Sequence, residues 1–327
     1  MESKNVKVGI IVARGAINNI VWIIFILLMI IFSTTIQGFF STENFINIIY
    51  HAVFIGILAI AETYVLISGN LDLSIESTAA CSAIVSVWLT ASSPYASGLM
   101  LNTWVGLLVA LAIGAAVGTF NAFFIVKLKI NSFLVTLSSY IFVRAIAIWV
   151  TGGMGMNGLP RAFRFIDVFR IFNIPLMVYL MIILYVVFEF ILKRTVFGKH
   201  LYIVGGNTNA AFNFGINVNN VIFKIFILSG VIAGLTGWLI AARANGSTSG
   251  QASGFLFEVL AAVVIGGVSL SGGVGSLIGV FAGTLVLGSI HSALNITAVS
   301  PFITDVIRGL LIIFAVSLDS LKRLFKK

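Results

Sequence analysis

The residues of this sequence that can do chemistry are few, and four of them are charges inside long apolar stretches. They are Glu62, Arg144, Asp305 and Arg308. A charge inside an apolar membrane segment is energetically expensive, so each one is a functional candidate by default. Asp305 and Arg308 stand three positions apart and can neutralise each other on one helix. Glu62 and Arg144 lie in different stretches at similar depths, and we expect them to pair between helices, with a proton relay at Glu62 as the alternative.

Uncharged polar side chains form a second set of candidates. Asn121 stands within one apolar stretch, and four more stand near the end of another, namely Ser289, His291, Ser292 and Asn295. Such side chains can exchange hydrogen bonds with a hydroxyl-rich neutral solute, and we expect them to line a translocation path. The alternative is that they hydrogen-bond neighbouring helices to one another, as polar residues in membrane helices do.

Several kinds of chemistry are missing from the sequence. No Gly-x-x-x-x-Gly-Lys-Ser/Thr loop occurs, and the nearest fragment, Phe197-Gly-Lys-His200, lacks the first glycine and the hydroxyl that would hold magnesium. The histidines at 51, 200 and 291 have no second ligand at metal spacing. The single cysteine, Cys81, rules out an internal disulfide. We expect no cofactor, no metal and no ATP hydrolysis on this chain.

The elements that must carry these residues follow from composition. Of the 327 residues, 60% are hydrophobic and 9% charged, whereas a soluble domain carries about 25% charged residues. A membrane-spanning helix needs roughly 20 mostly apolar residues. The sequence therefore predicts an all-α integral membrane protein, one multi-spanning domain over 1–327 with about ten helices, near 16–36, 45–67, 75–91, 104–126, 133–151, 174–192, 221–242, 258–270, 274–292 and 302–318. Two of these, 75–91 and 258–270, are short enough to be re-entrant or broken.

Glycine is patterned within these stretches. Small residues every four positions let helix backbones approach closely, and the spacing recurs at Gly114 and Gly118, at Gly230, Gly234 and Gly237, and at Gly275, Gly279 and Gly283. A weak internal repeat also relates residues 67–74 to residues 265–271. Duplicated halves are common in transporters, and the alternative is that glycine-rich turns resemble one another.

Basic residues are distributed unevenly among the connections. With the amino terminus inside, most of the 19 Lys and Arg residues fall on the cytoplasmic side. The positive-inside rule then places both termini in the cytoplasm and explains the net charge of +9 without a nucleic-acid partner. The exception is the loop 152–173, which places Arg161, Arg164 and Arg170 outside.

Three stretches carry a family resemblance. They are Ser68-Gly-Asn-Leu-Asp-Leu-Ser74; Phe197-Gly-Lys-His-Leu-Tyr-Ile-Val-Gly-Gly-Asn207, continuing through Ala210-Ala211 to Gly215-Ile216; and Phe257-Glu-Val-Leu-Ala-Ala-Val-Val-Ile-Gly-Gly-Val-Ser-Leu-Ser-Gly-Gly273. Together they resemble the permease subunits of ribose, xylose and galactose ABC importers over nearly the whole chain. The tail at 313–322 is most similar to the galactose and methylgalactoside branch.

The chain departs from the usual motifs at two places. The first motif usually reads Gly-Gly-Ile-Asp-Leu-Ser-Val-Gly, and here Asn70 replaces its second glycine and Glu76 its last. The third usually reads Tyr-Glu-Leu-Asp-Ala-Ile-Ala-Ala, and here Val259 follows Glu258 and the aspartate is missing. The glycines that shape the backbone remain.

The resemblance implies the fold of the larger-permease (type II) class of ABC importers and transport of a sugar by alternating access. The implied partners are a second permease chain, identical or different, a separate ABC ATPase that holds ATP and magnesium, an extracytoplasmic sugar-binding protein, and the lipid bilayer. The implied location is the bacterial cytoplasmic (inner) membrane.

The resemblance also marks the cytoplasmic loop 193–220 as the segment that couples to the ATPase. Such permeases present a helix with the pattern Glu-Ala-Ala-x-x-x-Gly. Here Asn209-Ala210-Ala211 followed by Gly215 matches it except at the first residue, with Asn207 just before. Two alanines allow a close approach to a partner, and Gly215 can end the helix in a left-handed conformation. The alternative is a solvated connecting loop.

The outward arginines Arg161, Arg164 and Arg170 suit the docking of the binding protein, since the resemblance implies acidic residues on that partner. Exposed ion pairs mainly speed and orient encounter. The alternatives are lipid headgroups, or neutralisation by Asp167 within the loop.

Other functions stay open at this stage. Within the class, the solute can be a nucleoside, an autoinducer or a branched-chain amino acid. Outside the class stands an ion-coupled secondary carrier, against which the scarcity of acidic groups inside the apolar stretches counts. A membrane enzyme acting on lipid would need a nucleophile, base or metal constellation, and the sequence offers none.

Overall fold

The computed structural model describes residues 20–300 and positions 303, 306, 307, 309, 310, 313 and 317. Asp305, Arg308 and most of the predicted helix 302–318 lie outside the described residues, as do residues 1–19.

Helices occupy the apolar stretches that composition marked, as expected of an all-α membrane protein. Within the described residues, six are long and apolar enough to cross a membrane, namely α3 (Thr42–Ile67), α5 (Thr103–Lys127), α6 (Ser132–Thr151), α8 (Leu176–Arg194), α11 (Val218–Ala244) and α13 (Leu277–Ile296). Three shorter apolar helices are α2 (Ile20–Thr35), α4 (Ile75–Thr90) and α12 (Phe255–Ile265). The 11 residues of α12 make a helix about 17 Å long, too short to cross a hydrocarbon core of about 30 Å.

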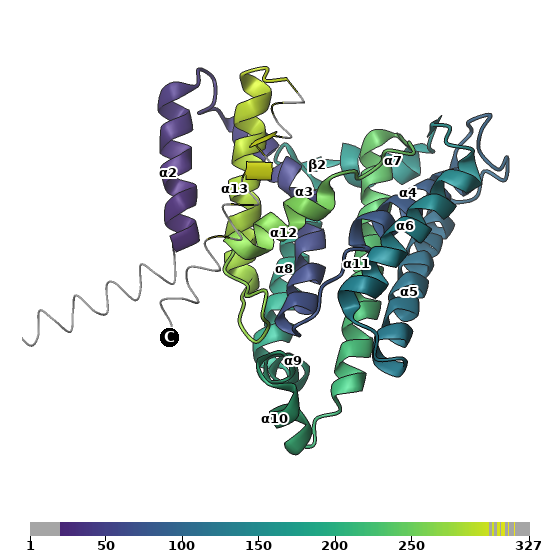
Figure 1. Ribbon diagram of the computed structural model, residues 1–327. Coiled ribbons are helices and arrows are strands. Elements are labelled where there is room, and N and C mark those ends of the chain that lie inside the picture. Colours follow the sequence, from purple (N-terminus) through teal and green to yellow (C-terminus); the bar gives the residue numbers. More distant parts are fainter. Residues whose placement is uncertain are drawn as a thin grey trace, which may run out of the picture.

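The remaining elements are small and lie at the two ends of the bundle. One end carries α7 (Arg161–Val168), and the other carries α9 (Val196–Gly206) and α10 (Thr208–Asn213) (Figure 1). β1 (Met156–Asn157) pairs antiparallel with β4 (Gly246–Ser247), and β2 (Arg170–Ile171) pairs with β3 (Ile174–Pro175). Such two-residue strands were not expected from the sequence, because they are too short to show an alternation of period two.

Capping side chains set several helix starts. Asn102, Asn131 and Asn217 each accept a hydrogen bond from a backbone N–H in the first turn of α5, α6 and α11. Such caps satisfy N–H groups that have no partner within the helix. The capping residues therefore mark where each apolar stretch begins its helix.

Two groups of helices make up the bundle. α11 packs against α4 and α5, and α6 packs against α4, while α3 contacts α8, α12 and α13. α3 and α11 also contact each other and so join the two groups (Figure 1). The buried core runs through both groups.

Glycines allow a close contact between α5 and α11. A Cβ added at Gly114 would lie 2.0 Å from the Gly230 carbonyl oxygen, and one at Gly230 would lie 2.0 Å from the Gly114 oxygen. Only glycine permits such an approach of two backbones. The prediction that the glycine pattern serves helix packing is confirmed here.

Candidate functional sites

A buried ion pair joins α4 and α6. Arg144 Nη2 lies 2.6 Å from Glu76 Oε1, and the two side chains are 15% and 2% exposed. The predicted pairing of Arg144 with Glu62 is therefore wrong. A charge in an apolar bundle requires a partner, and the packing of α4 against α6 places Glu76 within reach of Arg144.

The same pair holds the connecting segment 245–254 between α11 and α12, which is irregular after β4. Arg144 Nη1 donates to the carbonyls of Ser249 (3.2 Å) and Gln251 (3.0 Å), and Glu76 Oε2 accepts from the Leu256 N–H (3.0 Å). Irregular backbone inside a membrane bundle needs such partners, because its polar groups are not satisfied within the segment. Arg144 and Glu76 thus position this segment and the start of α12.

Glu62 belongs to a different polar network. Its Oε1 accepts from the Asp72 N–H at 3.4 Å. Asp72 in turn accepts from the hydroxyls of Ser74 (2.6 Å) and Ser229 (2.7 Å). This network fastens the turn between α3 and α4 to α11. The proton relay at Glu62 stays a prediction.

Asn121 is buried in the same region. It donates to Ser74 Oγ at 2.8 Å and accepts from Ser139 Oγ at 2.5 Å. Its hydrogen bonds therefore connect α5 to α6 and to the start of α4. This geometry fits the alternative role of holding helices together.

The predicted path residues on α13 have other partners than Asn121. Ser292 Oγ donates to Asn44 Oδ1 on α3, and Ser289 Oγ donates to Val286 O within α13. His291 Nε2 lies 3.2 Å from Glu258 Oε1 on α12, and Asn295 is exposed. The structure therefore does not bring the five predicted residues into one lining.

A cluster that the sequence analysis missed links α7, α3 and α11. Tyr50 Oη hydrogen-bonds to Asp167 Oδ1, and the Arg243 guanidinium lies 4.0 Å from the centre of the Tyr50 ring. Arg243 Nη2 also lies 3.5 Å from His51 Nδ1. The sequence showed Arg243 and Asp167 as charges, but only the fold brings the aromatic ring between them.

The arginines of the predicted docking loop line one cleft at the α7 end. Arg161, Arg164 and Arg170 surround a cavity of about 440 Å³ with Phe165, Val168 and Phe169. In the described part of the chain none of the three forms an ion pair, and Asp167 bonds to Tyr50 instead. The alternative in which Asp167 neutralises these arginines is therefore wrong, because in the described residues Asp167 forms no ion pair with any of them.

The predicted coupling segment forms the helical pair α9–α10. Asn207 caps α10 by accepting from the Ala210 N–H at 2.9 Å, and Gly215 follows the helix with φ +73°. Ala211 is 0% exposed, because it packs into the core of its own chain. The expectation that both alanines face a partner is therefore corrected, and a bulky charge at Ala211 is expected to disturb folding rather than docking alone.

Other side chains of α10 and its C-cap face outward. Phe212 and Phe214 are each 76% exposed, and Asn209 is exposed beside them. The resemblance named the alanines and not these rings, whose exposure depends on which face of α10 packs inward.

A junction of glycines connects α9 to the rest of the bundle. The Gly273 N–H donates to Ile67 O at 2.8 Å, and a Cβ added at Gly205 would lie 1.7 Å from the same Ile67 oxygen. Tyr202 Oη donates to Gly275 O at 2.7 Å. Burial and the nearby Glu189 carboxylate raise the pKa of Tyr202 to about 12, so its hydroxyl stays a donor at neutral pH. The two segments of the weak internal repeat also meet here, since a Cβ added at Gly69 would lie 4.0 Å from Ser271 O.

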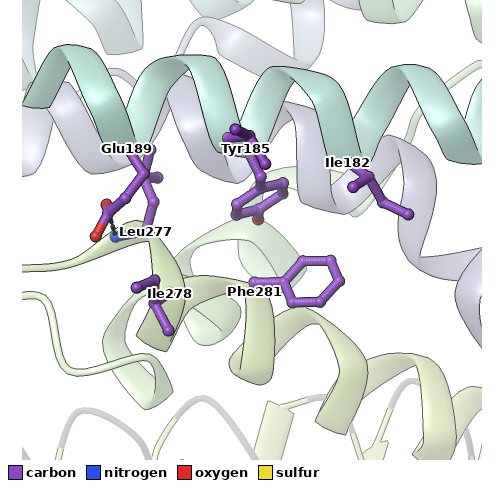
Figure 2. A pocket seen from close by; sticks show the side chains of 7 residues that line it. Ile182, Tyr185, Glu189, Leu277, Ile278 and Phe281 are labelled. Atoms are coloured by element: carbon purple, nitrogen blue, oxygen red, sulfur yellow. Dashed lines mark hydrogen bonds between the residues drawn. The ribbon is translucent and has the colours of Figure 1, made fainter.

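Glu189 fastens α8 to the start of α13. Its Oε2 accepts from the Leu277 N–H at 3.0 Å, and its Oε1 lies 2.6 Å from Lys193 Nζ. Figure 2 shows this contact beside an apolar cavity of about 330 Å³, with Tyr185 and Ile182 of α8 facing Phe281 of α13. A carboxylate at a helix N-terminus is favourable, so Glu189 stabilises this junction.

Long apolar helices, with irregular segments packed between them and a helical pair at one end, are the architecture of a multi-pass membrane protein. Residues 44–316 match the protein family described as the permease component of the branched-chain amino acid transport system, and the chain belongs to this family.

Curated relatives place the chain among ABC permeases. It is 35% identical over 322 residues to the probable ABC transporter permease protein YphD of Escherichia coli K12, covering 96% of this chain and 93% of the relative. It is 30% identical to the ribose import permease protein RbsC of the same strain, covering 91% and 92%. It is 31% identical to the L-arabinose transport system permease protein AraH of that strain, covering 83% and 81%. No solved structure matches the chain. The resemblance to permease subunits of sugar ABC importers is confirmed.

Proposed function

We propose that this permease imports a neutral sugar of monosaccharide size. The observation that supports the proposal is the extended identity with two relatives that are named for ribose and L-arabinose. The sequence has no phosphate-binding loop, so the energy comes from a separate ABC ATPase, which holds the ATP and magnesium. A second permease chain, identical or different, and an extracytoplasmic sugar-binding protein complete the importer.

The proposed orientation places the α9–α10 end in the cytoplasm and the α7 end outside, in the cytoplasmic membrane of a bacterium. Lys127 stands in the last turn of α5, and Lys193 and Arg194 stand in the last turn of α8. Clusters of Lys and Arg mark the cytoplasmic side of membrane proteins. Both termini are then cytoplasmic.

In this orientation α9–α10 is the surface that meets the ATPase. Phe212 and Phe214 provide exposed aromatic anchors, which are enriched at the centres of protein interfaces. At the glycine junction, Gly205 and Gly273 bring the backbone of α9 into direct contact with the turns after α3 and α12. A displacement of α9 is therefore transmitted to both turns. Asn207, Asn209 and Ala210 complete the coupling surface, with Gly215 closing the helix.

Reconstituted uptake tests the proposal. Proteoliposomes that contain the permease with its ATPase, ATP inside and loaded binding protein outside, are expected to accumulate labelled D-ribose or L-arabinose. Omitting ATP or the binding protein, or exchanging their sides, is expected to abolish uptake. Labelled leucine is the control, because the family description names branched-chain amino acids. Uptake of leucine but of neither sugar, or sugar uptake driven by a proton gradient alone, would overturn the proposal.

The cleft at the α7 end is the proposed dock for the binding protein. Reversing Arg161 and Arg164 to glutamate is expected to slow association of the binding protein by about tenfold at low salt, because complementary charges steer encounter. The salt dependence of the association rate is expected to weaken as well. Stopped-flow mixing at low and high salt measures both. Arg194→Glu, the same reversal at the opposite end, is the control. Equal rates in all three proteins at both salts would exclude this dock.

A further inference from the structure

A small cavity with both apolar and polar walls lies at the α7 end, where the β1–β4 ribbon meets the end of α11. Its volume is about 300 Å³, and its walls include Met156, Asn157, Ala244, Ser247, Thr248 and Gln251. Small-molecule sites occupy roughly 300–1,000 Å³, and one water takes up about 30 Å³ of liquid. The cavity therefore has room for a small solute.

Two of its polar side chains have hydrogen-bonding capacity that is unused, and the Ser247 hydroxyl among them is a fully buried atom. Ser247 is 2% exposed, and its Oγ has no partner among the described residues. Gln251 is 9% exposed and accepts from the Thr248 N–H at 3.1 Å, and its Nε2 group has no partner in that part of the chain. A buried hydroxyl without a partner, such as that of Ser247, is unfavourable. A solute that supplies hydrogen bonds here would relieve that penalty.

The chemistry of the walls indicates a neutral occupant. No charged side chain lines the cavity. The charged side chains that bond to this segment, Arg144 and Glu76, are bonded to each other, and Arg144 donates to the backbone carbonyl of Gln251. Hydroxyl and amide groups offer both donors and acceptors. These groups match a solute that carries several hydroxyls.

One of the two residues that hold the wall of the cavity in place departs from the usual motif of the permeases that this chain resembles. Glu76 stands where that motif ends in glycine, and through Arg144 it fixes the carbonyls of Ser249 and Gln251. Irregular backbone at such a position is tolerated where it is buried in protein or lines a water-filled cavity. Arg144 and Glu76 are thus positioning residues for the cavity wall.

We propose that the cavity between the β1–β4 ribbon and residues 244–251 is a binding site on the permease itself for a neutral monosaccharide. Ser247 and Gln251 are its buried hydrogen-bonding groups, and Thr248 and Asn157 are its exposed ones. The site rests on the proposed function and adds to it a direct contact between the permease and its solute.

Thiol protection tests the site without transport. Thr248→Cys places a reporter in the cavity wall, and the native Cys81 is buried at 5% exposure, which keeps the background low. The probes are D-ribose, L-arabinose, D-xylose and D-galactose, added to the full chain in detergent before a maleimide. A bound sugar slows labelling by about 1 + [L]/Kd, roughly tenfold at ten times the Kd.

Two further variants serve as controls. Ser253→Cys lies on the same segment, is exposed and does not line the cavity, so its labelling is expected not to change with sugar. Adding Gln251→Leu to Thr248→Cys is expected to remove the protection, which is measured as the ratio of the labelling rates with and without sugar in the same protein, because Gln251 also bonds to the Thr248 N–H and its loss can change the rate without sugar.

The outcomes separate the site from the proposed function. If the sugar that the complete importer takes up does not slow labelling at Thr248→Cys, or slows Ser253→Cys equally, the site is overturned while the function stands. If the complete importer takes up none of the four sugars and none of them protects, the proposed function and the site both fall. Protection that survives Gln251→Leu unchanged also overturns the site as assigned.

Discussion

Arg144→Leu is expected to lower the free energy of unfolding by about 3–5 kcal/mol, because it leaves the buried Glu76 carboxylate without its partner. It also removes the donors to the carbonyls of Ser249 and Gln251. Thermal unfolding of the purified chain in detergent measures the loss. Arg194→Leu, which removes an exposed arginine at the end of α8, is the control and is expected to stay within about 0.5 kcal/mol.

A double variant makes this prediction specific to the ion pair. Arg144→Leu with Glu76→Leu removes both charges, and replacing a whole buried pair with apolar residues is often neutral or stabilising. We therefore expect the double variant to regain most of the stability that the single variant loses. A double variant that is less stable than Arg144→Leu alone would show that Arg144 stabilises the fold through contacts other than its ion pair with Glu76.

Replacing both Phe212 and Phe214 with aspartate is expected to abolish ATP-driven uptake while the permease still folds. Each ring is 76% exposed, so little packing is lost within the chain. Aromatic anchors at interfaces are worth about 2 kcal/mol each, which is roughly 30-fold in Kd per ring. Co-purification of the ATPase and its stimulated hydrolysis rate are the measurements.

Asn213→Asp is the matched control, since Asn213 is also exposed on α10 and the change adds a charge without removing a ring. Its ATPase is expected to co-purify at the unmodified level. Full recovery of the ATPase with the double aspartate variant would show that the coupling surface lies elsewhere on the chain.

The membrane character of the chain and the positions of its helices could be predicted from local sequence. Whether a segment prefers lipid depends on its own side chains, so the long apolar stretches coincide with α3, α5, α6, α8, α11 and α13. The glycine spacing likewise predicted close packing. The absence of a side chain lets another backbone approach at that very position, as between Gly114 and Gly230.

The partners of the polar groups could not be predicted in this way. Arg144 was expected to pair with Glu62 because both stand deep in apolar stretches, and Glu76, in the first turn of α4, was noted only as a departure from a motif and not as a partner for a charge. The burial of Ala211 and the exposure of Phe212 also depend on which face of α10 meets α9 and α11.

The sequence by itself thus determined that this protein is a membrane protein, the extent of most of its helices and, through its motifs, its family. The tertiary structure alone decided which side chains meet, including Arg144 with Glu76, Arg243 with Tyr50, and Gly205 with the end of α3. The physical reason is the distance along the chain over which each effect acts. The transfer of a helix into lipid is a sum over neighbouring residues, whereas an ion pair or a glycine contact depends on how helices far apart in the chain cross.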